Sequence, residues 1–415
     1  MGGQDYSCVV ADEPAFQWRH DPALQRLFSL VNRDGEEVRV VGGAVRNSLL
    51  GAKVSDIDCA TTAEPDKIMA WAQEAGIKAI PTGIDHGTVT LVIDGRPFEL
   101  TTLRTDIETD GRHAEVAFGR DWVGDAHRRD FTMNAVYMDA AGRLYDPVGQ
   151  GIKDARARHV RFIGDANQRI AEDYLRVLRF FRFFSQYGER FEEGDYQACI
   201  AAQASLSTLS AERVGAEMTK LLEGPFSVRA LHAMHKGGML TGLLACVPHL
   251  ARFTRLKALA AQLYLKPDLN VLLTALCVDV REDAERLAKT LRLPNRNRDA
   301  MTRMAKTVCS IVAIDEQVLE QLAYMHGKET ARDLVLLALA RRQISPDLTK
   351  LSMLLRDIAL WTVPVFPLNG RDLIDKGMKP GPQIGSHLDQ LEKAWVASGF
   401  ALSKGQLLSM ARSLH

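Results

Sequence analysis

Features that define several protein classes are missing from this sequence. Its six cysteines stand far apart and form no CxxC pair, so the spacing of a zinc site is absent. We therefore expect buried, reduced thiols, which are typical of a cytoplasmic protein. There is no signal peptide and no apolar run long enough to cross a bilayer, so no membrane partner is expected.

Net charge is also missing, because 52 Lys and Arg residues balance 52 Asp and Glu residues. Any binding of nucleic acid must therefore depend on local clusters of basic residues. The remaining composition, 46% hydrophobic and 25% charged over 415 residues, is that of an ordinary globular protein. This length predicts about two to four domains.

Two halves of the chain differ in their patterns. The first 150 residues alternate strand and helix signals, with roughly five strands, and the Asp94-Gly95 pair predicts a hairpin turn. Strand signals nearly vanish after Gly149, where Leu, Ala, Arg and Lys recur at helical spacing. The chain is thus predicted to be α+β, a mixed-sheet head followed by a helical neck, body and tail. The expected boundaries are 1–150, 151–225, 226–360 and 361–415.

Acidic residues are the first candidates for chemistry. On a strand expected over residues 55–60, Asp56 and Asp58 project to one face. Glu99 lies on a second expected strand, over residues 97–103. If the two strands are neighbours, three carboxylates converge, and their repulsion calls for a divalent cation such as Mg²⁺. A DxD pair alone is equally compatible with a solvated edge or turn.

Glycines just before this pair favour a site for phosphate. Gly42 and Gly43 follow a strand and open a helix, where backbone N–H groups can approach an anion. Arg46 follows one turn later and is placed to hold a triphosphate oxygen. The pattern is not GxGxxG, so a dinucleotide fold is not indicated. Taken alone, the two glycines fit a simple tight turn.

Three further residues form a candidate reader of a sugar. Asp130 and Asn134 are four apart and are expected on one helical face, where a carboxylate beside an amide suits ribose hydroxyl groups. Arg129 could add positive charge for a phosphate. Ordinary surface charges at the start of a helix are the alternative.

A long amphipathic helix expected from Glu172 carries the last candidates. Asp173 and Arg176 share one face, either as an ion pair or as an acceptor and donor against a base edge. Cytosine and adenine both offer an amine and a ring nitrogen there, whereas guanine and uracil place a carbonyl before the carboxylate. Arg179 and Arg182 continue the basic edge and could contact RNA phosphates. The phenylalanines among them are expected in the core.

Together these motifs resemble the class II tRNA nucleotidyltransferases, the CCA-adding enzymes of the polymerase-β-like superfamily, and their bacterial poly(A) polymerase relatives. Each motif is weak, but their order and spacing are specific. The carrying segments are VVGGAVRNSLLG and SDIDCAT within 40–61, HGTVTLVI (86–93), FELTTLR (98–104), RRDFTMNA (128–135), YDPVGQGIKD (145–154), EDYLRVLRFFRF (172–183) and LSAERVGAEMTKLL (209–222).

The resemblance implies a role for each matching residue. Asp56 and Asp58 would bind two Mg²⁺ ions, with Glu99 as the third catalytic carboxylate. Gly42, Gly43 and Arg46 would contact the triphosphate, and Arg129, Asp130 and Asn134 the ribose. Asp173 and Arg176 would pair with CTP and then ATP, supported by Glu212, Arg213 and Glu217. Residues 104–120 would form a flexible loop, and residues 370–385 would grip tRNA.

The implied reaction is template-independent addition of CMP and AMP to the 3′ end of tRNA. A poly(A) polymerase, or an enzyme adding only CC or only A, is the first alternative. A non-catalytic RNA-binding protein on the same scaffold is an alternative of another class. No HD phosphohydrolase motif occurs in the helical half. The sequence leaves the oligomeric state open.

Overall fold

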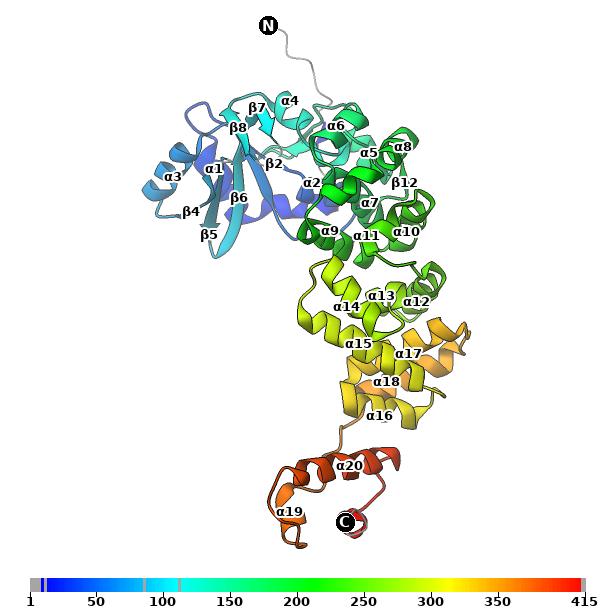
Figure 1. The fold of residues 1–415 in the computed structure, drawn as a ribbon. Coiled ribbons are helices and arrows are strands. Elements are labelled where there is room, and N and C mark those ends of the chain that lie inside the picture. The colour runs from blue at the N-terminus through cyan, green and yellow to red at the C-terminus, as the bar shows by residue number, and fades with distance from the viewer. Residues whose placement is uncertain (1–8, 11–12, 85–86, 111–112, 412–415) are drawn as a thin grey trace. The chain divides into compact units, whose positions relative to one another are not determined.

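The structure is a computed structural model that describes residues 9–10, 13–84, 87–110 and 113–411 (Figure 1). The chain forms two compact units, Met1–Leu243 and Leu244–His415. The finer division into head, neck, body and tail stays a prediction. None of the helices in the described part of the chain is long and apolar enough to cross a membrane.

A mixed eight-stranded sheet organises the first unit. Its order is β1-β10-β9-β2-β3-β6-β5-β4, and all neighbours are antiparallel except β3 and β6. The strands are β1 (Val9–Val10), β2 (Val38–Val41), β3 (Asp58–Thr61), β4 (Lys78–Gly83), β5 (Thr88–Ile93), β6 (Arg96–Thr102), β9 (Tyr137–Met138) and β10 (Arg143–Tyr145). The Asp94-Gly95 turn joins β5 to β6 as predicted, with positive φ at both residues.

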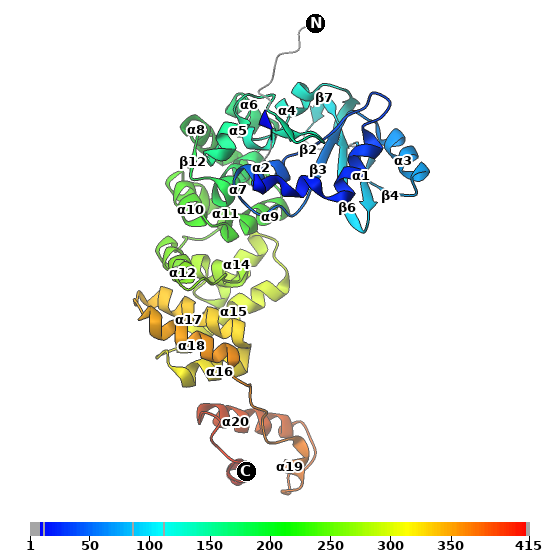
Figure 2. The same ribbon diagram turned by 180° about the vertical axis from the view of Figure 1, so that it is seen from behind.

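The sheet has more strands than the sequence predicted. β4 was missed because Pro81 interrupts its pattern, and it is tolerated there because β4 is an edge strand. The helices α1 (Pro22–Val31) and α3 (Pro65–Glu74) pack against β5, while α2 (Gly43–Leu49) packs against β2 (Figures 1 and 2).

A separate hairpin occupies the segment predicted to be a flexible loop. Strands β7 (Arg104–Asp110) and β8 (His113–Phe118) pair only with each other among the described strands. At its end, the Arg120 guanidinium pairs with the buried Glu36 carboxylate at 2.6 Å. The hairpin is thus attached to the head at its base.

The rest of the first unit is helical. Its helices are α4 (Trp122–His127), α5 (Gly151–Arg156), α6 (Ala166–Glu172), α7 (Leu175–Tyr187), α8 (Glu193–Ala201), α9 (Ala211–Glu223), α10 (Ser227–Lys236) and α11 (Met239–Leu244). Two short strands, β11 (His159–Val160) and β12 (Arg190–Phe191), pair in parallel. Phe180, Phe181, Phe183 and Phe184 of α7 are buried, which confirms that these rings belong to the core.

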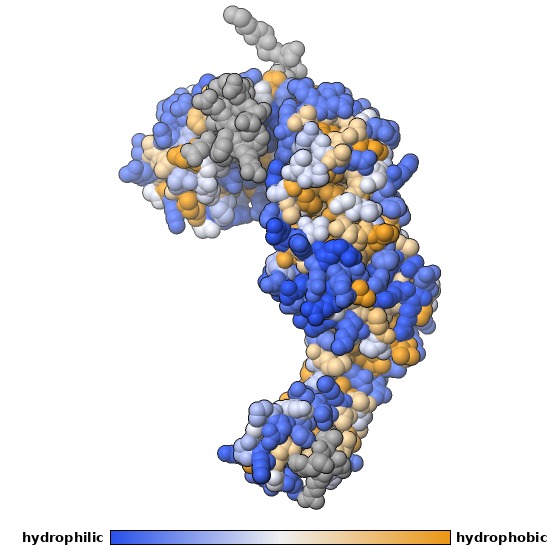
Figure 3. Space-filling model, viewed as in Figure 1, coloured by the Kyte–Doolittle hydropathy of each residue, from blue (hydrophilic) through white to orange (hydrophobic). Residues whose placement is uncertain are grey.

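The second unit consists of helices alone in its described residues. They are α12 (Leu250–Gln262), α13 (Leu269–Cys277), α14 (Arg281–Thr290), α15 (Asn295–Ser310), α16 (Glu316–His326), α17 (Lys328–Arg342), α18 (Leu348–Leu360), α19 (Gly370–Ile374), α20 (Gln383–Ala397) and α21 (Lys404–Ala411). Figure 3 shows a strongly hydrophilic face over α14 and α15.

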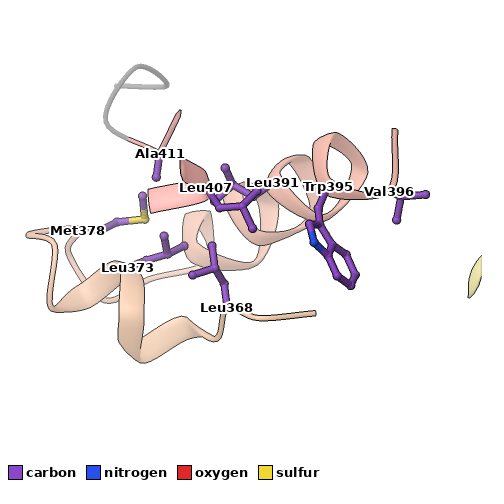
Figure 4. Close-up of a cluster of buried hydrophobic side chains, with 8 residues drawn as sticks. All are labelled: Leu368, Leu373, Met378, Leu391, Trp395, Val396, Leu407 and Ala411. Carbon is purple, nitrogen blue, oxygen red and sulfur yellow. The ribbon is translucent and has the colours of Figure 1, made fainter. Parts of the chain in front are cut away.

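The last three helices share a hydrophobic cluster of their own. Leu373 of α19, Leu391 and Trp395 of α20 and Leu407 of α21 are buried against one another (Figure 4). Phe400 packs edge-on against Trp395, with ring centroids 5.0 Å apart. A small hydrophobic core therefore lies within residues 368–411.

The cysteines follow the expectation in part. No disulfide joins the described cysteines, and Cys59, Cys199 and Cys277 are buried. Cys246 is only half-buried and Cys309 is exposed, so the expectation of burial was wrong for these two. Cys8 lies outside the described residues.

Candidate active site

Most of the candidate residues line one cleft in the first unit. Its volume is about 540 Å³, and its walls come from α2, β3, the segment after α4, α7 and α9. The predicted residues that line it are Gly42, Gly43, Arg46, Asp58, Arg129, Asp130, Asn134, Asp173, Arg176, Arg179 and Arg182. Residues far apart in the sequence thus converge on a space large enough for a nucleotide.

Two of the carboxylates predicted to be catalytic lie side by side, and Asp58 lines the cleft. Asp58 and Glu99 are direct partners in the parallel pairing of β3 with β6. Both side chains are exposed, while Cys59 and Leu100, the next residues on the two strands, are buried. The condition set for Glu99, that its strand neighbours the strand of Asp58, is thus met.

Asp56 departs from the predicted geometry. The strand begins at Asp58 and not at residue 55, so Asp56 lies in the loop that enters β3. It still stands near the pair, because it is one of the groups that raise the pKa of Asp58. Desolvation by the surrounding cleft wall has the largest effect on this pKa, followed by Glu99 and Asp56, although the Asp58 side chain stays in contact with solvent. Like charges so arranged favour a bound cation.

The donor set at this edge fits a hard divalent cation. No three His, Cys, Asp or Glu side chains among the described residues form a ready-made metal cluster. Mg²⁺ needs no such cage, because it commonly takes one or two carboxylates, water and substrate phosphates. Asp58 and Glu99 offer carboxylate oxygens of this kind at the mouth of an arginine-rich cleft.

The predicted phosphate contacts are two glycines and a buried arginine, Arg46, on the cleft wall. Gly42 has φ of 72°, which a residue with a side chain rarely adopts, and it is the N-cap residue just before α2 at the cleft wall. Arg46 of α2 donates through Nη1 to the Asn134 side-chain oxygen at 2.7 Å. Its guanidinium also stacks on the Tyr187 ring, 4.1 Å from the centroid. Burial lowers the pKa of Arg46, so an anionic ligand would stabilise its charge.

Asp130 and Asn134 meet, but not on an α-helix as predicted. Helix α4 ends at His127, and Thr132–Asn134 form a single 3₁₀ turn. The Asn134 amide nitrogen donates to Asp130 Oδ1 at 3.0 Å, and Arg179 Nε donates to Asp130 Oδ2 at 2.7 Å. Burial alone would raise the pKa of Asp130, but these donors hold it below its usual value.

Asp125 is a residue that the sequence reading missed. Its buried carboxylate pairs with Arg128 at 2.6 Å and with Arg129 at 2.9 Å, and accepts a hydrogen bond from the Tyr137 hydroxyl at 2.7 Å. It therefore holds two of the arginines that line the cleft. The i,i+3 and i,i+4 spacing within α4 and the turn after it could have revealed the pairing.

Asp173 and Arg176 do not pair with each other, so the ion-pair alternative is wrong. Asp173 stands in the kink between α6 and α7, not within one long helix as predicted. Its carboxylate accepts from the Leu175 amide at 3.0 Å and from Arg213 of α9 at 2.7 Å. Arg176 instead pairs with Glu172. Both lie at the cleft, held by other partners.

Arg179 and Arg182 lie in the same cleft and are both paired. Arg179 bonds Asp130, and Arg182 Nε lies 2.6 Å from the Glu217 carboxylate of α9. Their predicted contact with RNA stays a prediction. Among the described residues, seven arginines line the cleft: Arg46, Arg128, Arg129, Arg176, Arg179, Arg182 and Arg213. Phe183 and Tyr187 complete the wall and were not foreseen as site residues.

Known protein families match most of the chain. A family model described as poly A polymerase head domain matches residues 38–161. A model for an RNA and SrmB-binding site of polymerase A matches residues 191–253, and one for tRNA nucleotidyltransferase domain 2 matches residues 268–411.

Individual relatives resemble the chain over nearly its full length. The mitochondrial CCA tRNA nucleotidyltransferase 1 of Mus musculus is 33% identical over 411 residues, which cover 95% of this chain and 91% of the relative. The CCA-adding enzyme of Geobacillus thermodenitrificans is 35% identical over 388 residues, which cover 90% of this chain and 93% of the relative. The crystal structure of the Bacillus stearothermophilus CCA-adding enzyme in complex with CTP aligns with a TM-score of 0.76 at 29% identity, over 97% and 98% of the chains.

Proposed function

The chain belongs to the family of CCA-adding tRNA nucleotidyltransferases, and we propose that it completes the 3′ end of tRNA by adding C, C and A from CTP and ATP. One observation carries this proposal. A carboxylate pair on the neighbouring interior strands β3 and β6 adjoins a cleft lined by the residues to which we assign the triphosphate, the ribose and the base. No nucleic-acid template is needed, because protein groups select the base.

Each wall of the cleft would hold one part of the nucleotide. Arg46 and the Gly42 turn hold the triphosphate, since the buried guanidinium favours an anion. The Asp130 and Asn134 pair reads ribose hydroxyl groups. The base would then lie against Asp173 and Arg176, at the kink between α6 and α7.

Base choice would follow from the chemistry of two side chains. The Asp173 carboxylate accepts a hydrogen bond from the exocyclic amine of cytosine or adenine, and Arg176 donates to the ring nitrogen. Uracil and guanine would set a carbonyl oxygen against the carboxylate and are repelled. The two partners of Asp173, Arg213 and the Leu175 amide, fix the direction of its oxygens.

Family membership implies a divalent metal, and we assign two Mg²⁺ ions to Asp56 and Asp58. Bound there, they would lower the pKa of the RNA 3′-hydroxyl and offset the charge of the departing pyrophosphate. Glu99 is the adjoining carboxylate and can accept the proton of that hydroxyl. Arg129, held by Asp125, adds positive charge beside the phosphates.

The acceptor would be tRNA, met by basic residues outside the cleft. Although the chain has no net charge, exposed basic residues lie along α14, α15 and the turn between them: Lys289, Arg292, Arg296, Arg303 and Lys306. Phosphate contacts of this kind supply sequence-independent affinity. Residues 370–385 of the tail are proposed as a second contact. The described cysteines form no disulfide, which favours a cytoplasmic site of action.

The test uses the full chain with tRNA truncated at each 3′ step and with each nucleoside triphosphate supplied alone. CMP should enter tRNA that lacks CCA, and AMP should enter only tRNA ending in CC. UTP and GTP should give little product. A long adenylate tail would favour a poly(A) polymerase instead, and a product stopped at CC or needing CC would identify a partial enzyme.

Variants separate the enzyme from a non-catalytic RNA-binding protein. Asp58→Ala should abolish pyrophosphate release while the fold persists, whereas Asp66→Ala, an exposed carboxylate on α3, should keep wild-type activity. If wild type itself releases no pyrophosphate with Mg²⁺, tRNA and CTP, the enzymatic proposal fails.

A further inference from the structure

Arg169 occupies an unusual position in the first unit. It lies on α6, and its side chain is only 11% exposed. Its Nη2 group donates to two backbone carbonyl oxygens, those of Arg128 at 2.6 Å and Arg129 at 2.7 Å. Its Nη1 group pairs with Glu172, the last residue of the same helix. One guanidinium thus clamps α6 onto the segment that leads from Arg129 to Asp130.

The same helix also holds Arg176. The Nη1 group of Arg176 donates to the backbone carbonyl oxygen of Arg169 at 2.6 Å, seven residues back in the chain. It also pairs with the Glu172 carboxylate. These bonds cross the kink at Asp173, where regular helical hydrogen bonds are interrupted. Arg169 and Glu172 therefore fix the position of the Arg176 side chain across the kink, where no continuous helix does so.

The arrangement carries an electrostatic cost. Arg169 and Arg176 share the single Glu172 carboxylate, and burial together with the Arg176 cation lowers the pKa of Arg169. The repulsion between these two guanidinium groups opposes folding, and an apolar residue in place of Arg169 would avoid it. Local stability therefore does not explain why an arginine stands at this position. The reason lies in what the clamp joins: the ribose-reading turn on one side and the base-reading arginine on the other.

We propose that Arg169 is a positioning residue for base selection, holding Arg176 in register with the ribose-reading turn through Glu172 and its own carbonyl oxygen. The inference rests on the proposed function. A base is read correctly only if its sugar and its pairing edge are held at a fixed spacing. Arg169 fixes that spacing from α6, beside the bond that Arg179 of α7 makes to Asp130.

Selectivity, and not activity alone, tests this role. In the full chain, Arg169→Gln should lower the ratio of kcat/KM for CTP to that for UTP, on tRNA lacking CCA, by about tenfold or more. The KM for CTP should rise more than kcat falls. Arg169→Lys should restore little, because an ammonium cannot fork to two carbonyl oxygens and a carboxylate.

A double variant shows whether Arg169 acts through Arg176. Arg176→Ala should itself relax selectivity, and adding Arg169→Gln should lower the ratio no further. Independent losses that multiply in the double variant would overturn the proposal. Glu172→Gln, at a more exposed carboxylate, breaks the other arm of the clamp and should also relax selectivity. It serves as the second variant if Arg169→Gln fails to fold.

Arg252 provides a matched structural control in the second unit. Its side chain is 7% exposed, so it is buried at least as deeply as Arg169, and it donates to the backbone carbonyl oxygens of Thr274 and Ala275 and to the Asp279 carboxylate. Arg252→Gln should lower thermal stability and leave the CTP to UTP ratio unchanged.

The outcomes separate this inference from the proposed function. A wild-type chain that incorporates CMP and AMP, with an unchanged ratio in Arg169→Gln, refutes only the inference. A wild-type chain that incorporates neither refutes the function itself.

Discussion

Asp125→Asn removes one charge from the network that holds the cleft and tests whether that network is structural. The carboxylate is 1% exposed and receives two guanidinium groups and one hydroxyl group. Breaking a buried ion pair by removing one partner costs roughly 3–5 kcal/mol, because the remaining charge stays buried without compensation. Total stabilities are about 5–15 kcal/mol, so the loss is large.

The acid dependence of this effect has a definite sign. Burial would raise the pKa of Asp125, but Arg129 and Arg128 hold it below its usual value in the folded chain. Its contribution is therefore present above the unfolded pKa, near 4, and is lost as pH falls through the lower folded value. The stability gap between wild type and Asp125→Asn should shrink below about pH 4.

Local hydrogen exchange is the appropriate assay, because a chain of two compact units need not unfold in one step. Peptides covering residues 122–138 should exchange much faster in Asp125→Asn at pH 7. Asp121→Asn is the control, since Asp121 only caps α4 and Asn caps nearly as well. The KM for CTP should also rise as Arg129 loses its anchor. A local loss below about 1 kcal/mol would refute the reasoning.

Three further variants extend these expectations. Arg213→Gln should change Tm little, because its pair with Asp173 is half-exposed, but should lower CTP over UTP selectivity in single-nucleotide assays. Burial raises the pKa of Asp195 to about 6, so the stability that its protonated form contributes should be lost as pH rises from about 4 to 7. In urea titrations the stability of wild type relative to Asp195→Asn should therefore fall over this range. Trp395→Ala should cost about 3–5 kcal/mol in the tail cluster, seen as faster hydrogen exchange over residues 370–411.

Local patterns allowed several elements of the first unit to be predicted from the sequence. Strand β2, the turn at Asp94-Gly95 and the buried phenylalanines of α7 follow rules that act over a few residues. The pairing of Asp58 with Glu99 was foreseen only as a condition, because no local signal states which strands are neighbours. The resemblance to a family supplied that information.

Errors arose where tertiary contacts override spacing. Asp173 and Arg176 have the spacing of an ion pair, yet α9 brings Arg213 to the first and the kink brings Glu172 to the second. The role of Asp125 was not predicted, because it depends on the burial of its carboxylate, and the spacing of charges does not reveal burial. The clamp made by Arg169 ends on backbone carbonyl oxygens, which carry no sequence signature at all.

The seven arginines of the cleft have a consequence for kinetics, because the chain as a whole is neutral. At physiological ionic strength a charge is screened beyond about 8 Å, so an approaching polyanion feels this field only near the protein surface. Long-range steering is thus weak, and productive encounters must begin by near-random collision. Added salt should therefore shorten the lifetime of the bound complex far more than it slows its formation.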